Sequence, residues 1–484
     1  MVIFHYFCGS FNNHKRQYVA LITSISGIRG TIGGNVGEAL TPLDIVKFTA
    51  AFGTQLRRKN PDNKKIIVGR DARLSGDMVS KLVVATLQSL GFNVIDLGLS
   101  TTPTVEIAVP AENAAGGIIL TASHNPIQWN ALKLLDHQGE FISAQTGLEM
   151  LDIAQAEDFD FVEVRKLGAY IQDDSYFQKH IDAVLALPLV NKAAIEAKNF
   201  RVVVDAVNSS GGIVVPMLLE ALGVKKENIR LLHCEPTGDF AHNPEPLPEN
   251  LRDICRELER GDFDIGIVVD PDVDRLALIC EDGSPFGEEY TLVAVADYVL
   301  KHQVGNTVSN LSSTAALRDV TLAAGGQYAA AAVGEVNVVE KMKATNAIIG
   351  GEGNGGIIYP ELHYGRDALV GIALFLSHLA KFGKSASTLR RTYPNYYISK
   401  NKIELTANIN VDGILESIKD KYIKYPLNTI DGLKIEFDKE WVHLRKSNTE
   451  PIIRIYSESA TEATAEHLAK KIMQDIKELV NLHD

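Results

Sequence analysis

One local pattern occurs three times along this 484-residue chain, and it restricts the fold more than any other feature. In each copy a β-branched apolar run ends in a loop of small polar residues, a helix-like segment follows, and a second apolar run comes after a glycine. The copies begin at Ile66 to Val68, Arg201 to Val204, and Thr307 to Val308. Each copy has the size of a strand–helix–strand unit of about 30 residues, which favours parallel or mixed sheets flanked by helices. The sequence therefore predicts an α/β fold with three similar mixed-sheet domains.

The carboxyl-terminal part follows a different pattern. Leu433 to Phe437 and Trp441 to Leu444 alternate like an antiparallel hairpin, Ile452 to Tyr456 reads as another strand, and Ala463 to Val480 has helical spacing. We therefore predict a fourth, α+β domain after a linker near Arg391 to Asn395. The predicted boundaries are a loosely ordered extension over 1–20, α/β domains over 21–168, 169–282 and 283–392, and the α+β domain over 393–484.

Composition excludes several classes of function. A hydrophobic content of 45% and a charged content of 23% let every part bury a core. The net charge of −13 argues against a non-specific nucleic-acid or membrane surface, and no apolar run reaches the ~18 residues of a membrane span. The four cysteines form no C-x-x-C pair, so we expect reduced thiols in a cytoplasmic protein.

A serine stands among polar side chains in the segment Thr121 to Pro126. The preceding Gly116 to Leu120 reads as a buried strand, so Ser123 is expected at a strand's carboxyl end, where α/β sheets place their chemistry. An Asn-Pro turn with locally satisfied hydroxyls is the simpler alternative. Lys133 follows closely and is a candidate general acid/base or phosphate partner, although a lone lysine is more often a solvated surface charge.

Three carboxylates, Asp270, Asp272 and Asp274, follow a second apparent strand that ends at Val269. Such carboxylates repel one another by roughly 1–4 kcal/mol per close pair, and a divalent cation relieves that repulsion. A turn rich in aspartate is the alternative, and an EF-hand is excluded because Arg275 replaces the glycine of its sixth position. A serine that can carry phosphate and a carboxylate site that can hold Mg²⁺ together suggest phosphoryl transfer.

A third loop, Gly350 to Gly356, nominally contains G-x-G-x-x-G. An apolar run follows it instead of a helix, so a dinucleotide site is excluded. Its Glu352 and Asn354 suit vicinal sugar hydroxyls, with a tight glycine turn as the alternative. In the tail, Arg445 to Pro451 and then Arg454 gather arginines, hydroxyls and amides that fit a phosphate dianion, with a basic surface loop as the alternative.

These stretches occur in the order and approximate spacing of the phosphohexomutase family, which the chain resembles from about Leu21 onward. Members interconvert hexose 1-phosphates and 6-phosphates, and the resemblance implies four domains around a central cleft, bound Mg²⁺, and a hexose bisphosphate as intermediate and activator. It further implies that the catalytic residues are Ser123, His124, Lys133 and Arg29, that the substrate-binding residues are Glu352, Asn354, Arg275, Arg445, Ser447, Asn448, Thr449 and Arg454, and that the metal ligands are Asp270, Asp272, Asp274 and the phosphate on Ser123.

Departures from the family pattern concern the sugar. Many members carry Ser where Asn354 stands and His where Gly356 stands. This loop and Trp129 to Lys133 look most like bacterial members that act on glucosamine phosphate, so that substrate is expected, with mannose or glucose phosphate as the alternative. A metal-dependent sugar phosphatase and a non-catalytic sugar-phosphate-binding protein are alternatives of other classes. His242 to Pro244 resembles an interdomain histidine–proline loop whose role is left open, as is the choice between monomer and homodimer.

Overall fold

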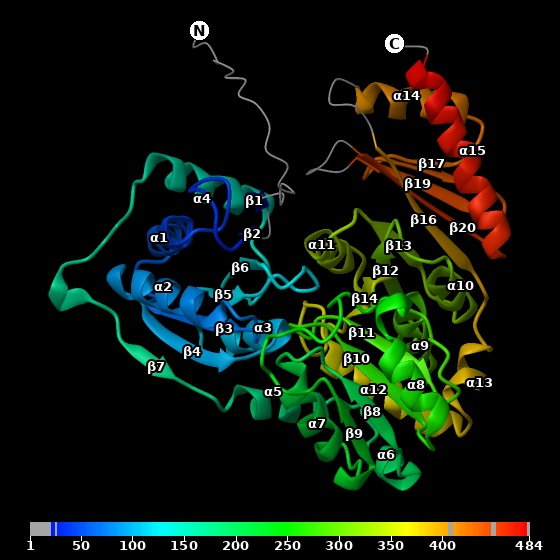
Figure 1. Cartoon of the computed structure of the whole chain (residues 1–484), viewed down its shortest axis with the longest axis horizontal. Helices are drawn as coiled ribbons and strands as arrows, with labels where there is room; N and C mark the ends of the chain where they lie inside the picture. Colours follow the sequence, from blue (N-terminus) through cyan, green and yellow to red (C-terminus); the bar gives the residue numbers. More distant parts are fainter. Residues whose placement is uncertain (1–20, 25–26, 405–409, 447–451, 482–484) are drawn as a thin grey trace, which may run out of the picture.

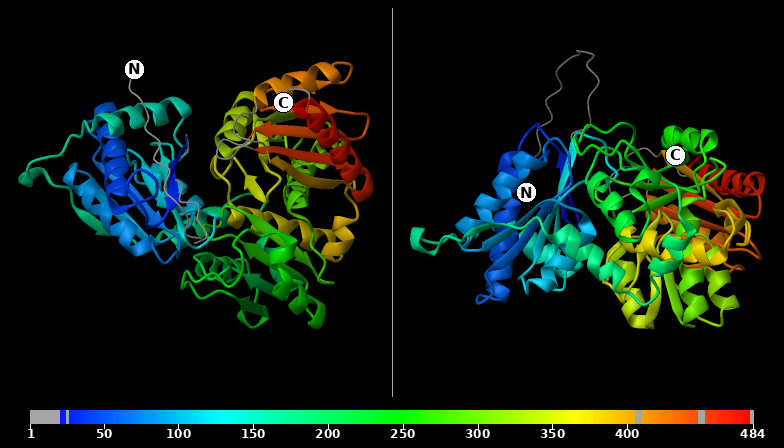
Figure 2. Two further views of the ribbon diagram at one scale, coloured as in Figure 1. Left: turned by 45° about the horizontal axis from the view of Figure 1, so that its top comes forward. Right: turned by 90° about the horizontal axis from the view of Figure 1, so that it is seen from below.

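The computed structural model describes residues 21–24, 27–404, 410–446 and 452–481 (Figure 1). Three α/β domains and a fourth domain with an antiparallel sheet follow one another along the chain, which confirms the predicted fold class. They form an arc with domain 1 and domain 4 at its two ends (Figure 1 and Figure 2). The central cleft implied by the resemblance stays a prediction. Among the described helices, none has the length and apolar content needed to cross a bilayer.

Domain 1 is built on a seven-stranded mixed sheet. In sheet order its strands are β1 Leu21–Ser24, β2 Gly27–Thr31, β6 Trp129–Leu135, β5 Gly117–Leu120, β3 Lys65–Arg70, β4 Asn93–Leu99 and β7 Tyr170–Gln172. Its helices are α1 Pro42–Lys59, α2 Gly76–Ser89, α3 Thr102–Ala111 and α4 Ala144–Ala156.

The edge strand β7 lies just after the predicted boundary between 168 and 169. It pairs in parallel with β4, so the sheet of domain 1 reaches Gln172. All three of its residues are exposed, and a strand that buries no side chain leaves no apolar alternation in the sequence. The predicted domain boundaries stay predictions.

Domains 2 and 3 each carry a four-stranded sheet. Domain 2 contains β8 Val202–Asp205, β9 Ile229–Leu232, β10 Ile265–Val269 and β11 Leu276–Cys280, with helices α5 Tyr176–Leu185, α6 Lys192–Lys198, α7 Gly211–Ala221 and α8 Arg252–Arg260. Domain 3 contains β12 Asn306–Asn310, β13 Tyr328–Ala331, β14 Ala347–Glu352 and β15 Gly356–Ile358, with helices α9 Glu288–His302, α10 Ala316–Ala323, α11 Glu335–Thr345, α12 Ala368–Phe382 and α13 Ala386–Arg390.

One strand order is common to the three α/β domains. The sheets read β6-β5-β3-β4, β11-β10-β8-β9 and β15-β14-β12-β13, which is the same order of fourth, third, first and second strand. In each, the first strand pairs in parallel with the second and the third, and the fourth strand is antiparallel to the third. The loop between third and fourth strand therefore has an equivalent place in every α/β domain.

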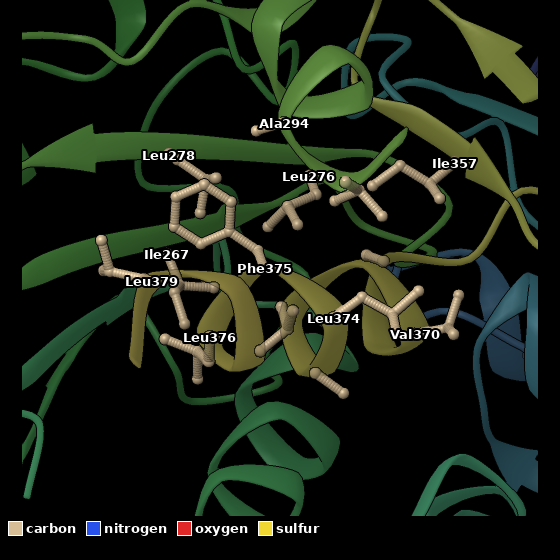
Figure 3. Packing of buried hydrophobic residues seen from close by; sticks show 14 of the residues in the cluster. Ile267, Leu276, Leu278, Ala294, Ile357, Val370, Leu374, Phe375, Leu376 and Leu379 are labelled. Atoms are coloured by element: carbon tan, nitrogen blue, oxygen red, sulfur yellow. The ribbon is translucent and has the colours of Figure 1, made fainter. Parts of the chain in front are cut away.

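Domains 2 and 3 share one hydrophobic core. Helix α12 of domain 3 lies against strands of both sheets, with Leu276 and Leu278 of β11 and Ile357 of β15 beside its apolar side chains (Figure 3). Phe375 of α12 meets Phe286 edge to face at 5.2 Å. Because this core continues from one domain into the other, the two domains are held as one body.

Domain 4 has a core of its own. Its antiparallel sheet has the order β16-β20-β19-β18-β17, and the hairpin predicted around Leu433 and Trp441 pairs Leu433 with Leu444. Its strands are β16 Tyr397–Glu404, β17 Leu427–Asn428, β18 Leu433–Glu436, β19 Trp441–Lys446 and β20 Ile452–Ser459, and its helices are α14 Val411–Lys421 and α15 Glu462–Asn481.

Candidate active site

The serine loop joins β5 to β6, the third and fourth strands of the four-strand unit β3 to β6 that domain 1 shares with domains 2 and 3. Ser123 is buried, and its φ of +47° puts it in the left-handed region that non-glycine residues rarely adopt. In that conformation its hydroxyl donates a hydrogen bond of 2.7 Å to Asp270 Oδ2 in domain 2. The Nδ1 atom of His124 lies 3.4 Å from the Ser123 Oγ. The left-handed backbone conformation of Ser123 thus places its Oγ at the acidic loop. The surrounding contacts stabilise this strained conformation.

Arg73, which sequence reasoning missed, stabilises the serine loop. It is 1% exposed and lies beside Asp71, with its Nε 3.1 Å from Asp71 Oδ2. Its guanidinium also donates to four main-chain carbonyls of the loop, those of Ser123, Asn125, Pro126 and Trp129. An arginine with five donors in a fixed plane can hold such a loop in one shape.

The acidic loop joins β10 to β11, the third and fourth strands of domain 2. Asp270, Asp272 and Asp274 are all fully buried, and one carboxylate oxygen of each lies within 4.8 Å of the others. Burial, followed by the charges of Asp274 and Asp272, raises the pKa of Asp270 well above its ordinary value. Val273 between them has a φ of +61°, which is strained for a β-branched residue.

The oxygen atoms of this loop fit a divalent cation. Asp272 Oδ1 and Asp274 Oδ1 are buried and have no hydrogen-bond partner among the described residues. Unpartnered buried carboxylate oxygens are costly, and three mutually repelling carboxylates are a typical set of hard ligands for Mg²⁺ or a similar ion. This buried triad of aspartates is a site that can bind a metal.

Lys133 on β6 connects the two loops. Its Nζ lies 2.6 Å from Asp272 Oδ2, 3.2 Å from Asp274 Oδ2 and 3.3 Å from Thr102 Oγ1. Burial alone would lower the pKa of Lys133, but the charges of Asp272 and Asp274 raise it above its ordinary value. The lysine therefore stays protonated in this arrangement and neutralises part of the acidic cluster.

Further polar groups surround the serine. Arg29 on β2 donates a 3.1 Å hydrogen bond to Asn125 Oδ1, and the Arg275 main-chain N–H donates to Asp270 at 3.2 Å. Burial, then the charges of Arg275 and Arg29, lowers the pKa of His124 to about 2. The His124 ring is therefore neutral at physiological pH. The site has cationic side chains for a phosphate and one uncharged imidazole beside the serine.

The sugar loop joins β14 to β15, the third and fourth strands of domain 3. Glu352 is buried at the end of β14, where Oε1 accepts from Asn310 and from the Gly334 main chain. Oε2 accepts from Arg366 at 3.1 Å and from Asn354 at 3.5 Å. Burial opposes ionisation, but the charge of Arg366 lowers the pKa of Glu352 below its ordinary value. Glu352 is thus a buried, ionised carboxylate.

Domain 4 contributes the predicted phosphate-binding arginines on two neighbouring strands. Arg445 on β19 pairs in register with Arg454 on β20, and Arg454 is exposed. The Nε of Arg445 lies 2.7 Å from a carboxylate oxygen of Asp431. Ser447, Asn448 and Thr449 lie outside the described residues.

The structure therefore brings together most of the predicted residues. Direct contacts join Ser123, His124, Lys133, Arg29, Arg275 and the three aspartates through the loops of domains 1 and 2. Glu352 and Asn354 reach that group through Arg366, which sequence reasoning also missed, because Arg366 contacts Asp274 at 2.8 Å. His242, whose role was left open, lies 3.2 Å from Asp205 in domain 2.

Comparisons with known proteins agree with this arrangement. Four successive domain descriptions match: phosphoglucomutase/phosphomannomutase α/β/α domain I over 21–161, domain II over 178–283, domain III over 287–396, and the carboxyl-terminal domain over 402–475. The chain belongs to the phosphoglucomutase/phosphomannomutase family. It is therefore an enzyme of the isomerase class, as the sequence resemblance implied.

Individual relatives are similar over nearly their whole length. A phosphoglucomutase/phosphomannomutase of Thermococcus kodakarensis is 35% identical, with 90% of this chain and 95% of the relative covered. A phosphoglucosamine/phosphogalactosamine mutase of Sulfurisphaera tokodaii is 32% identical, with 94% and 98% covered. The crystal structure of a phosphomannomutase family protein from Thermus thermophilus superposes with a TM-score of 0.79 at 24% identity, over 95% and 99% of the two chains. That last likeness concerns the fold alone.

Proposed function

We propose that this protein interconverts hexose 6-phosphate and hexose 1-phosphate through a phosphoserine at position 123 and a hexose bisphosphate. The observation that carries the proposal is the buried 2.7 Å contact between the Ser123 hydroxyl and Asp270, inside an acidic cluster that includes Lys133. A hydroxyl beside carboxylates that can hold a cation suits phosphoryl transfer, where catalysis consists mainly of positioning and charge stabilisation.

The reaction consists of two phosphoryl exchanges. In the first, the P–Oγ bond of phosphoserine 123 breaks, a P–O bond to the free sugar hydroxyl forms, and the hydroxyl proton passes to the serine oxygen. The neutral ring of His124, whose Nδ1 lies 3.4 Å from Oγ, orients the serine oxygen during this transfer. In the second exchange the bisphosphate has turned round in the site. The bond between its other phosphate and the sugar oxygen breaks, a P–Oγ bond to Ser123 forms, and the serine proton passes to the sugar oxygen. A magnesium ion held by the three aspartates would stabilise the charge on the transferring oxygens.

The remaining residues hold the substrate. Lys133, Arg29 and Arg275 supply positive charge around the transferring phosphate. Glu352 and Asn354 hold sugar hydroxyls, and the 3.5 Å bond between them is the longest that Glu352 accepts, so a sugar hydroxyl can replace it. The non-reacting phosphate binds in domain 4 at Arg445, Ser447, Asn448, Thr449 and Arg454. Arginines suit this role because they bind phosphate oxygens in pairs.

Glucosamine 6-phosphate is the first candidate substrate. Relatives named phosphoglucosamine mutase, among them one of Pyrococcus horikoshii at 32% identity, support it. Mannose or glucose 6-phosphate is the second candidate, supported by the relative at 35% identity that is named phosphoglucomutase/phosphomannomutase.

Side-by-side kcat/KM values for glucosamine, mannose and glucose 6-phosphates, each with its bisphosphate as activator, test this proposal. We expect the highest value for glucosamine 6-phosphate, and a strong preference for mannose 6-phosphate would overturn that choice. Free phosphate released in place of the isomer would favour the phosphatase alternative. Intact-protein mass after exposure to bisphosphate should rise by one phosphate. If it does not, a non-catalytic binding protein becomes the better description.

A further inference from the structure

Arg366 ties the metal loop to the sugar loop. It lies just before α12 and is 8% exposed. Its Nη2 lies 2.8 Å from Asp274 Oδ2 of domain 2, and its Nη1 lies 3.1 Å from Glu352 Oε2 of domain 3. Its Nε and main-chain N–H lie 2.9 Å and 3.0 Å from the two carboxylate oxygens of Glu335. One planar guanidinium thus has a carboxylate on each of its three nitrogens.

Gly356 provides the space for this side chain. A Cβ atom at position 356 would lie 2.3 Å from Cδ and 3.1 Å from Cγ of Arg366, closer than non-bonded carbon atoms approach. The backbone φ of Gly356 is not in the left-handed region, so conformation alone does not require glycine there. The contact with the arginine stem is therefore the physical reason for a residue without a side chain at this position.

The arrangement has a consequence for the sugar. Glu352 is the carboxylate that faces the sugar hydroxyls in the proposed function, and its orientation depends on the donors that hold it. Without Arg366, the side chains of Asp274, Glu335 and Glu352 would lose the buried cation between them, and their mutual repulsion would push them out of alignment. A lysine could supply the charge but not three directed donors in one plane.

We propose that Arg366 is a positioning residue for the hexose site, aligning Glu352 with the metal loop through Asp274, and that Gly356 is the residue that admits it. This inference rests on the proposed function, since it assigns the sugar to the same site. It also gives a physical reason why this chain has Gly356 where many family members have histidine. The Arg366 side chain, which comes from the residue just before Asp367 and α12, fills the space that a side chain at position 356 would take.

Double-mutant cycles of substrate affinity, measured in a protein that cannot turn the substrate over, test the proposal. In a Ser123→Ala background, calorimetry measures the Kd of glucosamine 6-phosphate and, in parallel, mannose 6-phosphate. We expect Arg366→Met and Glu352→Gln each to weaken binding by about 30-fold, and the double variant to be no weaker than the worse single one. A purely structural arginine would lower the melting temperature but leave the Kd of the folded protein unchanged.

Gly356→Ala gives a second, milder cycle. Its new methyl group displaces Arg366, so we expect Gly356→Ala to weaken hexose 6-phosphate binding roughly tenfold in the Ser123→Ala protein. In the Ser123→Ala, Arg366→Met protein, Gly356→Ala should not weaken binding further. If Arg366→Met does not fold, Arg366→Lys replaces it in both cycles. Arg58→Met, which removes an exposed arginine paired with Asp160, is the matched control and should leave Kd unchanged.

The outcomes separate the two proposals. Additive effects of Arg366→Met and Glu352→Gln, or an equal loss from Gly356→Ala with and without Arg366, would overturn the positioning role and leave the mutase proposal intact. A Ser123→Ala protein that is folded but binds none of the hexose 6-phosphates would overturn both.

Discussion

The three α/β domains and domain 4 contribute to the site in different ways. In each α/β domain the loop between the third and fourth strands of the shared unit bears site residues. Buried polar contacts between domains join these loops directly or through Lys133 of β6 and Arg366 before α12. Ser123 contacts Asp270, Lys133 contacts Asp272, and Arg366 contacts Asp274. Domain 4 meets domain 3 through polar contacts with the loop after β12, with the loop after β13 and with helices α9 and α10. The Lys434 ammonium donates to Leu311 O, and the Glu458 carboxylate accepts from the Ala315 N–H.

This difference separates a fixed part from an adjustable part. Breaking one buried ion pair by removing a partner costs about 3–5 kcal/mol, so the loops of domains 1 to 3 hold one another in place. The contacts of domain 4 with domain 3 are hydrogen bonds and partly exposed ion pairs, each of which typically contributes about 1 kcal/mol or less. We therefore expect domain 4 to pivot on its contacts with domain 3 while the phosphoryl-transfer centre keeps its geometry. Such a division suits a substrate that must turn round between two steps.

The largest expected effect is on the fixed side. Ser123→Ala removes the oxygen that accepts and returns the phosphate, so we expect kcat of the mutase reaction to fall by at least about 10⁴-fold. A coupled assay for hexose 1-phosphate measures it, with Ser143→Ala, at the start of α4, as the matched serine control. A Ser123→Ala enzyme within tenfold of the parent would show that another residue carries the phosphate.

A second test concerns the support of the serine loop. Arg73→Met leaves Asp71 as a buried, unpaired carboxylate and frees four loop carbonyls, so we expect domain 1 to lose about 3–5 kcal/mol of unfolding free energy. The shift of its transition in urea measures this loss. Arg70→Met is the control, because Arg70 donates a single bond to a main-chain carbonyl and should cost at most about 1 kcal/mol. Equal losses in the two variants would contradict the special role of Arg73.

The sequence predicted the loops better than it predicted what holds them. Ser123 and the three aspartates could be found because short polar segments follow long apolar strands, and strand ends are where such sheets place chemistry. Arg73 and Arg366 could not, because an arginine in a sequence gives no sign of burial, and long-range pairing with carboxylates decides their position. The edge strand β7 was missed for the opposite reason, since it buries nothing.

On the adjustable side, Arg445→Met tests the phosphate clamp. Losing a charged donor to the non-reacting phosphate should raise KM for the hexose 6-phosphate roughly 30-fold, which corresponds to about 2 kcal/mol, with a smaller change in kcat. Steady-state kinetics measure both constants. Lys446→Met, which removes the neighbouring cation that pairs with the exposed Asp412, should leave KM within about threefold of the parent. A fall in kcat alone after Arg445→Met would place Arg445 with the transfer chemistry instead.

The smallest effect concerns pH at the contact between domains 3 and 4. His443 is 1% exposed, its Nε2–H donates to Asp431 O, and its Nδ1 therefore accepts from the Ser312 hydroxyl in domain 3. Burial lowers the pKa of His443 from 6.5 to about 4. Between pH 6.5 and 4, His443 is therefore protonated in the unfolded chain but not in the folded protein. The free energy of unfolding falls as the pH drops through that window.

The loss expected from His443 between pH 7 and pH 5.5 is about 1 kcal/mol, because only part of the titration falls in that interval. The unfolding transition of domain 4, followed by the fluorescence of Trp441, measures it. His443→Gln cannot take up a proton, so its stability should decline less over the same interval, although it starts lower by the cost of a disturbed hydrogen bond. Parallel pH profiles for the two proteins would mean that the folded protein protonates His443 as readily as the unfolded chain does, so that His443 is charged at pH 5.5 in the folded state. The polar contact at Ser312 would then need a different proton arrangement, and the pivot would carry a charge that the present geometry excludes.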